Sequence, residues 1–335
     1  MAFNVVHNRS LSNNPILNLI PGFNIYPQAP YKMKSYLPKI ALSLFFLLSF
    51  QSLIACDICG CSSGNYFLGP SPQFNKFFIG TRYSFRSFNT VLKTNNEQFS
   101  KDFYQTAELW GGIKIKQRFQ ALVFLPYNVN QSKSDDGNRL IQGLGDLTLI
   151  GNYSILDNLS LTKESNAISQ QLWLGLGVKL PTGQYVIDKA EVVSTANSQP
   201  GTGSFDYLVT TTYNLAINNW GIASNLNYKI NQSASSFHFG NRLSATAFAF
   251  RTFHFKSNSI SPTIGLVYEN LKQSELAKLK IENTGGNAFL VAVGLESKFK
   301  NISFGVNAQL PITQNISDLQ TKINLRGMVH LTYAF

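Results

Sequence analysis

The last fourteen residues, KINLRGMVHLTYAF (322–335), alternate between apolar and polar side chains with a period of two. This period is typical of a β-strand with one apolar face, because successive side chains of a strand point to opposite faces. The segments 77–88 and 300–312 alternate in the same way. After Gly64 we find no stretch that combines a 3.6-residue period with helix caps. The sequence therefore predicts a chain made almost entirely of strands.

The number and length of these segments favour a transmembrane antiparallel β-barrel. Most run beyond the usual strand of about 5–6 residues and match the roughly 9–11 residues that cross a bilayer at a tilt. An even count of twelve is expected, and ten or fourteen are the alternatives. The twelve expected strands are 77–88, 104–116, 119–131, 144–156, 170–181, 204–216, 219–231, 240–253, 259–271, 285–298, 300–312 and 322–335.

Aromatic residues and connection lengths agree with a barrel in the outer membrane of a Gram-negative bacterium. Tyr and Trp lie near segment ends, where interfacial girdles form. Phe335 ends the chain within a strand and resembles the C-terminal signal read by the barrel-assembly machinery. Every second connection is short except 157–169, whereas the others, such as 89–103 and 182–203, are long and polar. Alternation alone also fits a soluble β-sandwich, including one tethered by lipid.

The N-terminal part predicts export. Lys34 and Lys39 precede an apolar run and a small residue at Ala55, as in a secretory signal peptide over 33–55. The run is too short for a transmembrane helix of about 20 residues. Residues 1–32 are polar and rich in Asn, and we interpret them as an unstructured extension or a mis-annotated start. Residues 56–76 are then a periplasmic tether before the barrel at 77–335.

The three cysteines of the chain, Cys56, Cys59 and Cys61, fall within that tether. LIAC at 53–56 resembles a lipobox, which predicts either lipid on Cys56 or ordinary cleavage before it. A soft-metal site formed by the three thiolates is the weaker alternative, because the segment offers no fourth ligand. In an oxidising compartment the remaining thiols either pair or stay free. A disulfide across the one residue between Cys59 and Cys61 would be strained.

Inward-facing charges are the candidate functional residues of the barrel. The chain has 28 basic and 17 acidic residues, but no basic block that indicates a nucleic-acid partner. The charges either pair and plug the lumen or leave a positive field that favours anions. The lumen-lining candidates are Arg82, Arg86, Glu108, Lys114, Lys179, Lys229, Arg242, Glu269, Glu296 and Arg326.

Three blocks in the middle of the chain carry a family resemblance: GLGDLTLIGNYSI (143–155), LGLGVKLPTGQY (174–185) and QPGTGSFDYLVTTTY (199–213). They resemble the signature blocks of the phenol-degradation meta-pathway family of outer-membrane proteins. The resemblance implies a β-barrel that passes small, often hydrophobic molecules. Read physically, Gly143 and Gly145 permit positive φ and close backbone approach, and Pro181 ends a strand.

An enzymatic function is not expected, because no serine lies in a G-x-S-x-G elbow and no catalytic carboxylate pair is recognisable. We predict no catalytic residue and no cofactor. The expected function is passive diffusion of a small, hydrophobic or anionic solute through the barrel. The alternative is a barrel without transport, which serves as an anchor or as a surface-interaction protein.

Overall fold

The computed structural model describes residues 77–92, 98–116, 118–134, 137–158, 168–186 and 198–335. These residues form antiparallel strands joined by turns and loops. No helix among them is long and apolar enough to cross a membrane.

Twelve long strands form one sheet in the described part of the chain, which confirms the expected count. Two short strands extend members of this sheet: β4 (Gly137–Leu144) precedes β5 and pairs with β3, and β12 (Phe253–Phe255) follows β11. The long strands are β1 (Phe77–Leu92), β2 (Gln98–Ile115), β3 (Phe119–Ser134), β5 (Thr148–Asn158), β6 (Ile168–Lys179), β7 (Asp206–Ile217), β8 (Trp220–Ile230), β11 (Arg242–Arg251), β13 (Asn258–Leu271), β16 (Gly286–Phe299), β17 (Ile302–Ile316) and β18 (Thr321–Ala334).

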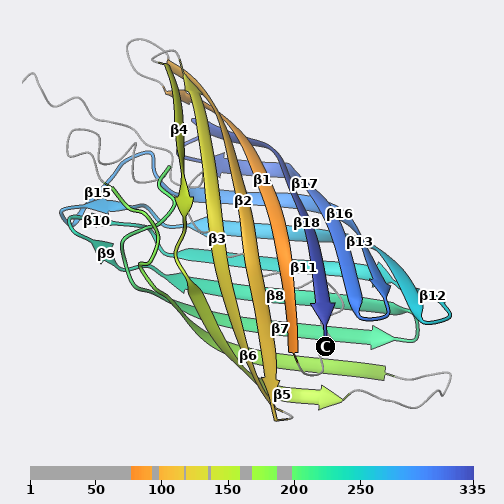
Figure 1. Ribbon diagram of the computed structural model, residues 1–335. Helices are drawn as coiled ribbons and strands as arrows, with labels where there is room; N and C mark the ends of the chain where they lie inside the picture. The colour runs from red at the N-terminus through yellow and green to blue at the C-terminus, as the bar shows by residue number, and fades with distance from the viewer. Residues whose placement is uncertain (1–76, 93–97, 117, 135–136, 159–167, 187–197) are drawn as a thin grey trace, which may run out of the picture. The chain divides into compact units, whose positions relative to one another are not determined.

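The sheet closes on itself as a barrel. Strand β1 pairs with β2 on one side and with the last strand, β18, on the other. Figure 1 shows this seam, with orange β1 beside dark blue β18. Strands β8, β11 and β13 complete the circle, because β11 pairs with both of its neighbours. Closure leaves no long sheet edge, which removes the row of unpaired backbone groups that an open sheet presents.

The two faces of the barrel wall differ in polarity. On β5, Thr148 and Asn152 point inward and are buried, whereas Leu149 and Tyr153 point outward and are exposed. The same alternation places apolar side chains on the outer surface of other strands, for example Ile264 at 59% exposure. A soluble barrel shows the reverse pattern, so the outer surface is suited to lipid.

The interior is not wholly polar. Two groups of inward-facing apolar side chains are buried. One group consists of Phe78, Trp110, Leu122, Phe124, Ile150 and Leu208. The other consists of Phe88, Tyr104, Phe248, Val267, Ala288, Leu290, Ala292, Ile316 and Ile323. They fill part of the lumen between the polar residues.

Connections at one end of the barrel are tight turns, as expected. Four of them contain a non-glycine residue with positive φ, namely Lys116, Asn218, Lys256 and Lys300. The 157–169 connection falls mainly on 159–167, outside the described residues.

Several boundaries at the other end were predicted wrongly. Much of the expected loops 89–103, 132–143 and 313–321 is strand. Strands β1, β2, β3 and β17 continue into these loops, and β4 forms within the second of them. Expected loops 232–239 and 272–284 contain the short strands of a second sheet. Those strands are β9 (Ser233–Ala234), β10 (Phe237–His238), β14 (Glu275–Leu276) and β15 (Leu279–Lys280). The two loops pair with each other through β10 and β14. They can do so because one loop connects β8 to β11 and the other connects β11 to β13, and these three strands are neighbours in the barrel wall.

Candidate functional site

Asp146 is the centre of a buried polar cluster that joins the three sequence blocks. It lies in the break between β4 and β5, and its Oδ2 is 2.5 Å from Nζ of Lys179. The backbone N–H groups of Gly183 and Thr202 each donate to the carboxylate at 2.9 Å, and the Thr202 hydroxyl also donates at 2.9 Å. Because these donors surround the carboxylate, its charge is satisfied although the side chain is 1% exposed.

Lys179, the last residue of β6, links this carboxylate to a second one. Its Nζ lies 3.0 Å from Oδ2 of Asp206 at the start of β7, and it also donates to Thr202 and to the Ser204 carbonyl. Asp206 in turn contacts Nζ of Lys229 on β8 at 3.1 Å. Two aspartates and two lysines therefore alternate in one buried chain from the β4–β5 break across β6, β7 and β8, and together they carry no net charge.

Segments 181–186 and 198–204 fold toward the barrel interior. On the inward face of β3, Asn128 donates to the carbonyl of Pro200 at 2.8 Å and Asn130 donates to the carbonyl of Ser198 at 2.7 Å. The N–H of Gly201 donates to the carbonyl of Gln184 at 2.9 Å, so the two segments also pair with each other. We call residues 181–186 and 198–204 the inner segment. It narrows the lumen beside β3.

Glycines allow the inner segment to approach Asp146 closely. A Cβ on Gly201 would lie 2.8 Å from Oδ1 of Asp146, and a Cβ on Gly183 would lie at the same distance from that atom. Gly203 has a positive φ of 67°. The prediction for Gly143 and Gly145 was correct for close approach, because a Cβ on either residue would meet a neighbour within 3 Å, but wrong for φ, because neither has the positive value.

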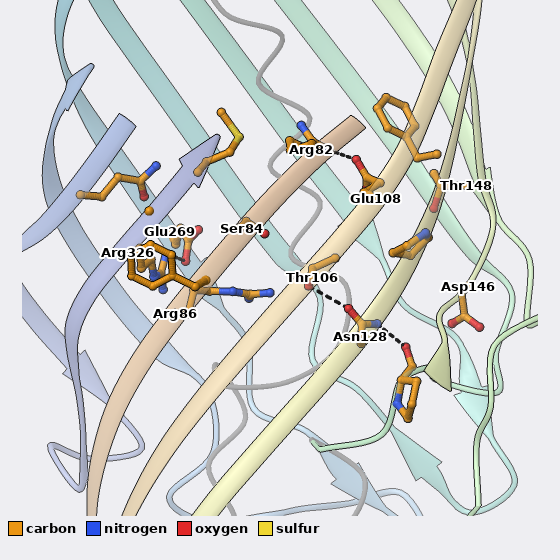
Figure 2. A pocket seen from close by; sticks show the side chains of 17 residues that line it. Arg82, Ser84, Arg86, Thr106, Glu108, Asn128, Asp146, Thr148, Glu269 and Arg326 are labelled. Atoms are coloured by element: carbon orange, nitrogen blue, oxygen red, sulfur yellow. Dashed lines mark hydrogen bonds and ion pairs between the residues drawn. The ribbon is translucent and has the colours of Figure 1, made fainter. Parts of the chain in front are cut away.

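A second charged network lies on β1, β2, β11, β13 and β18. Arg82 donates to Glu108, its direct partner on β2. Glu269 accepts from Arg242 and from Arg326, each at 2.9 Å. Figure 2 shows Arg86 extended from β1 toward Thr106, with Arg326 and Glu269 behind it.

A cavity of about 80 Å³ lies between the two networks. Arginines from β1 and β18 form one side, and Asn128 and Asp146 form the opposite side (Figure 2). Pro200 also lines the cavity. Phe124, Pro126 and Met328 contribute apolar surface to its wall. The cavity therefore offers positive charge, hydrogen-bond donors and apolar contact within one small space.

The structure also places the remaining predicted residues, Lys114 and Glu296, beside hydrogen-bonding partners. Lys114 lies 3.2 Å from Asp157, and Glu296 lies 3.0 Å from Nε2 of His330. Of the seven basic candidates, six form ion pairs with acidic residues: Arg82, Lys114, Lys179, Lys229, Arg242 and Arg326. Pairing is thus the outcome for these six, rather than an unopposed positive field.

Sequence reasoning missed three acidic partners: Asp146, Asp157 and Asp206. Two of them were visible as the aspartates of the GLGD and GSFD motifs, each close to a strand boundary. Their role depends on contacts with Lys179, 33 residues after Asp146, and a single sequence does not display such a contact.

The cysteine predictions lie outside the described residues, since Cys56, Cys59 and Cys61 precede Phe77. Among the residues that the structure does describe, no group of three or more His, Cys, Asp or Glu side chains is placed to hold a metal ion.

Comparisons with known proteins support the barrel fold. No family model matches the chain, and no curated protein matches it. It is similar to the crystal structure of an outer membrane channel from Pseudomonas putida F1, with 14% identity and a TM-score of 0.57 over 82% of this chain and 99% of that chain.

Two autotransporter barrels are also similar, at TM-scores below 0.5. They are the β domain of BrkA from Bordetella (11% identity, TM-score 0.45, 78% of this chain and 100% of that chain) and the translocator domain of NalP from Neisseria meningitidis (11%, 0.40, 80% and 91%). At 14% identity, the likeness to the Pseudomonas putida channel shows the fold alone.

Proposed function

We propose that this protein is a channel of the bacterial outer membrane through which a small solute diffuses along the barrel lumen. The observation that carries the proposal is the division of the closed wall into an apolar outer face and a charged inner face that borders a cavity. Hydrated solutes require such an inner surface, and lipid requires such an outer one. The similarity to the Pseudomonas putida channel is consistent with this function.

The inner segment sets the width of the path. It is fixed to Asp146 and to β3 by hydrogen bonds rather than by an apolar core, so its position depends on a few polar contacts. The GLGD, KLPTG and PGTGS blocks supply these contacts. We propose that the blocks define a structural unit of the phenol-degradation meta-pathway type, and that their residues act by shaping the lumen.

One observation favours a barrel without transport. Ion pairs and the inner segment occupy much of the lumen, as they would in a barrel that serves only as an anchor or as a surface-interaction protein. Such a barrel would still insert into membranes, but it would not conduct.

Reconstitution of the full-length mature protein into liposomes separates the two functions. We expect swelling in a panel of small neutral solutes and stepwise conductance in planar bilayers. Asp146→Asn should increase both, because it weakens the anchoring of the inner segment. Folded protein that inserts but gives neither swelling nor conductance, in the wild type and in Asp146→Asn alike, would refute the channel and favour the anchor.

The route to the membrane is part of the proposal. Residues 33–55 would be removed on export, and 56–76 would link any lipid on Cys56 to the barrel. Phe335 would be read by the barrel-assembly machinery. Its N–H donates to the Phe77 carbonyl at 2.9 Å, and its ring lies 4.9 Å from that of Phe77, so the C-terminal residue lies at the seam that closes the barrel.

A further inference from the structure

Two arginines face each other across the seam strands. Arg86 on β1 and Arg326 on β18 are direct cross-strand partners, and both are buried, at 7% and 4% exposure. Like charges directly opposite each other in a sheet are unfavourable, and burial strengthens their repulsion because it removes water. An anion between or beside them would relieve this repulsion.

Glu269 is the acidic side chain that the described residues place beside these arginines. Glu269 accepts from Arg326 and Arg242, and it is also within electrostatic reach of Arg86. These three arginines and one glutamate carry a formal charge of +2. Arg82, the next inward arginine of β1, already has its own partner in Glu108.

Among the described residues, Glu269 satisfies the hydrogen-bond donors of Arg326 only in part. Its Nη1 contacts Glu269, whereas its Nε and Nη2 are buried and have no hydrogen-bond partner among the described residues. A buried donor without a partner costs about 1–3 kcal/mol, and more when it is charged. Arg326 and Arg86 both line the cavity, so their guanidinium groups border the space in which a ligand would lie.

The rest of the cavity wall indicates which anion fits. Phe124, Pro126 and Met328 border the space beside the guanidinium groups. Inorganic anions gain nothing from apolar contact, whereas a carboxylate on a short hydrocarbon gains from both sets of groups. The fork of a guanidinium also matches the two oxygens of a carboxylate.

We propose that this cavity is a binding site for small organic carboxylates, held by Arg86 and Arg326 with their hydrocarbon part against Phe124, Pro126 and Met328. The inference rests on the proposed channel function, because the ligand would reach the site along the lumen. Small organic carboxylates would then be the solute class that the channel binds during passage.

Calorimetry on the full-length mature protein in detergent tests the site without any transport. The probes are butyrate, its neutral analogue butyramide, and inorganic phosphate. We expect butyrate to bind at least about tenfold more tightly than butyramide, since charged hydrogen bonds are worth that much. Equal binding of butyrate and butyramide, or tighter binding of phosphate than of butyrate, would overturn the proposal.

Single substitutions of arginine test where butyrate binds. Arg86→Gln should weaken butyrate binding at least about tenfold. Arg251→Gln is the matched control, because Arg251 is exposed and lies over the Trp220 ring at 5.1 Å, away from the cavity. Arg86→Lys keeps the charge but loses the fork, so it should weaken binding to an intermediate degree. It also replaces Arg86→Gln as the test if that variant does not fold.

Wild-type affinity in Arg86→Lys, or an equal loss in Arg251→Gln, would contradict the assignment. Failure of the site and failure of the channel are distinguishable. Butyrate binding without liposome swelling would leave the carboxylate site and refute transport. Swelling with neutral solutes without butyrate binding would leave the channel and refute the site.

Discussion

Asp146 and Lys179 form an ion pair inside the barrel, with 2.5 Å between Oδ2 and Nζ and with both side chains 1% exposed. Asp146 comes from the break between two strands, and Lys179 ends the next strand along the chain. Around this pair the backbone of the inner segment donates its N–H groups. The pair therefore connects the barrel wall to the element that narrows the lumen.

Asp146→Asn should destabilise the barrel and widen its path. The change leaves the Lys179 ammonium with one carboxylate instead of two, and breaking a buried pair costs about 3–5 kcal/mol. We expect a lower unfolding midpoint in urea with lipid vesicles and a larger single-channel conductance. An unchanged conductance in a variant that folds would show that Asp146 does not hold the inner segment in place.

Gly201→Ala should also destabilise the barrel and widen its path, in this case through steric contact. Its Cβ would lie 2.8 Å from Oδ1 of Asp146, so the inner segment must shift. Gly151→Ala is the control, because its Cβ would meet only a carbonyl oxygen at 3.9 Å. The measurements to compare are the single-channel conductance and the urea unfolding midpoint of the two variants. Equal behaviour of both would rule out tight contact at Gly201.

Val306→Arg tests the assignment of the outer face to lipid. Val306 is exposed on β17, four residues from the tight-turn end, and an arginine near the bilayer midplane costs about 2–4 kcal/mol. Ile302→Arg lies on the same face at the strand end, where the cost falls to about 0–1 kcal/mol. Folding yields in vesicles should therefore differ. Equal yields would contradict a membrane-spanning β17.

Glu269→Gln should make the channel more selective for anions. It removes the carboxylate that accepts from Arg242 and Arg326, so the positive charge at the cavity increases. The reversal potential in a salt gradient should shift toward the chloride equilibrium potential. Glu275→Gln in β14 is the matched control with the same change of charge. A shift toward cations in Glu269→Gln would exclude a path past these arginines.

Intact-mass analysis of protein purified from membranes tests the export prediction. We expect a chain that begins at Cys56, with a diacyl or triacyl mass if the lipobox is used and without added mass if ordinary cleavage occurs. Retention of residues 1–55 would refute the signal peptide. A copper or zinc titration of the reduced protein that leaves its mass and thiol reactivity unchanged would exclude the metal alternative.

The sequence by itself determined the kind of fold. Period-two alternation over segments such as 322–335 was sufficient for twelve strands, because one face of each strand must be apolar and the other polar wherever a wall separates two environments. Turn positions followed from the same pattern. The strand ends next to the long loops did not follow from this pattern. There β1 and β17 continue to pair with neighbouring strands after the alternation weakens.

Only the tertiary structure decided the arrangement of the lumen. The sequence placed Arg82, Lys179 and Arg326 on inward faces, but their partners depend on which strands become neighbours and on where the inner segment folds. Lys179 meets Asp146 and Asp206 because β6 lies between β5 and β7, and Arg86 meets Arg326 because the first strand closes against the last. Closure brings together residues 240 positions apart, and local periodicity contains no information about contacts of that range.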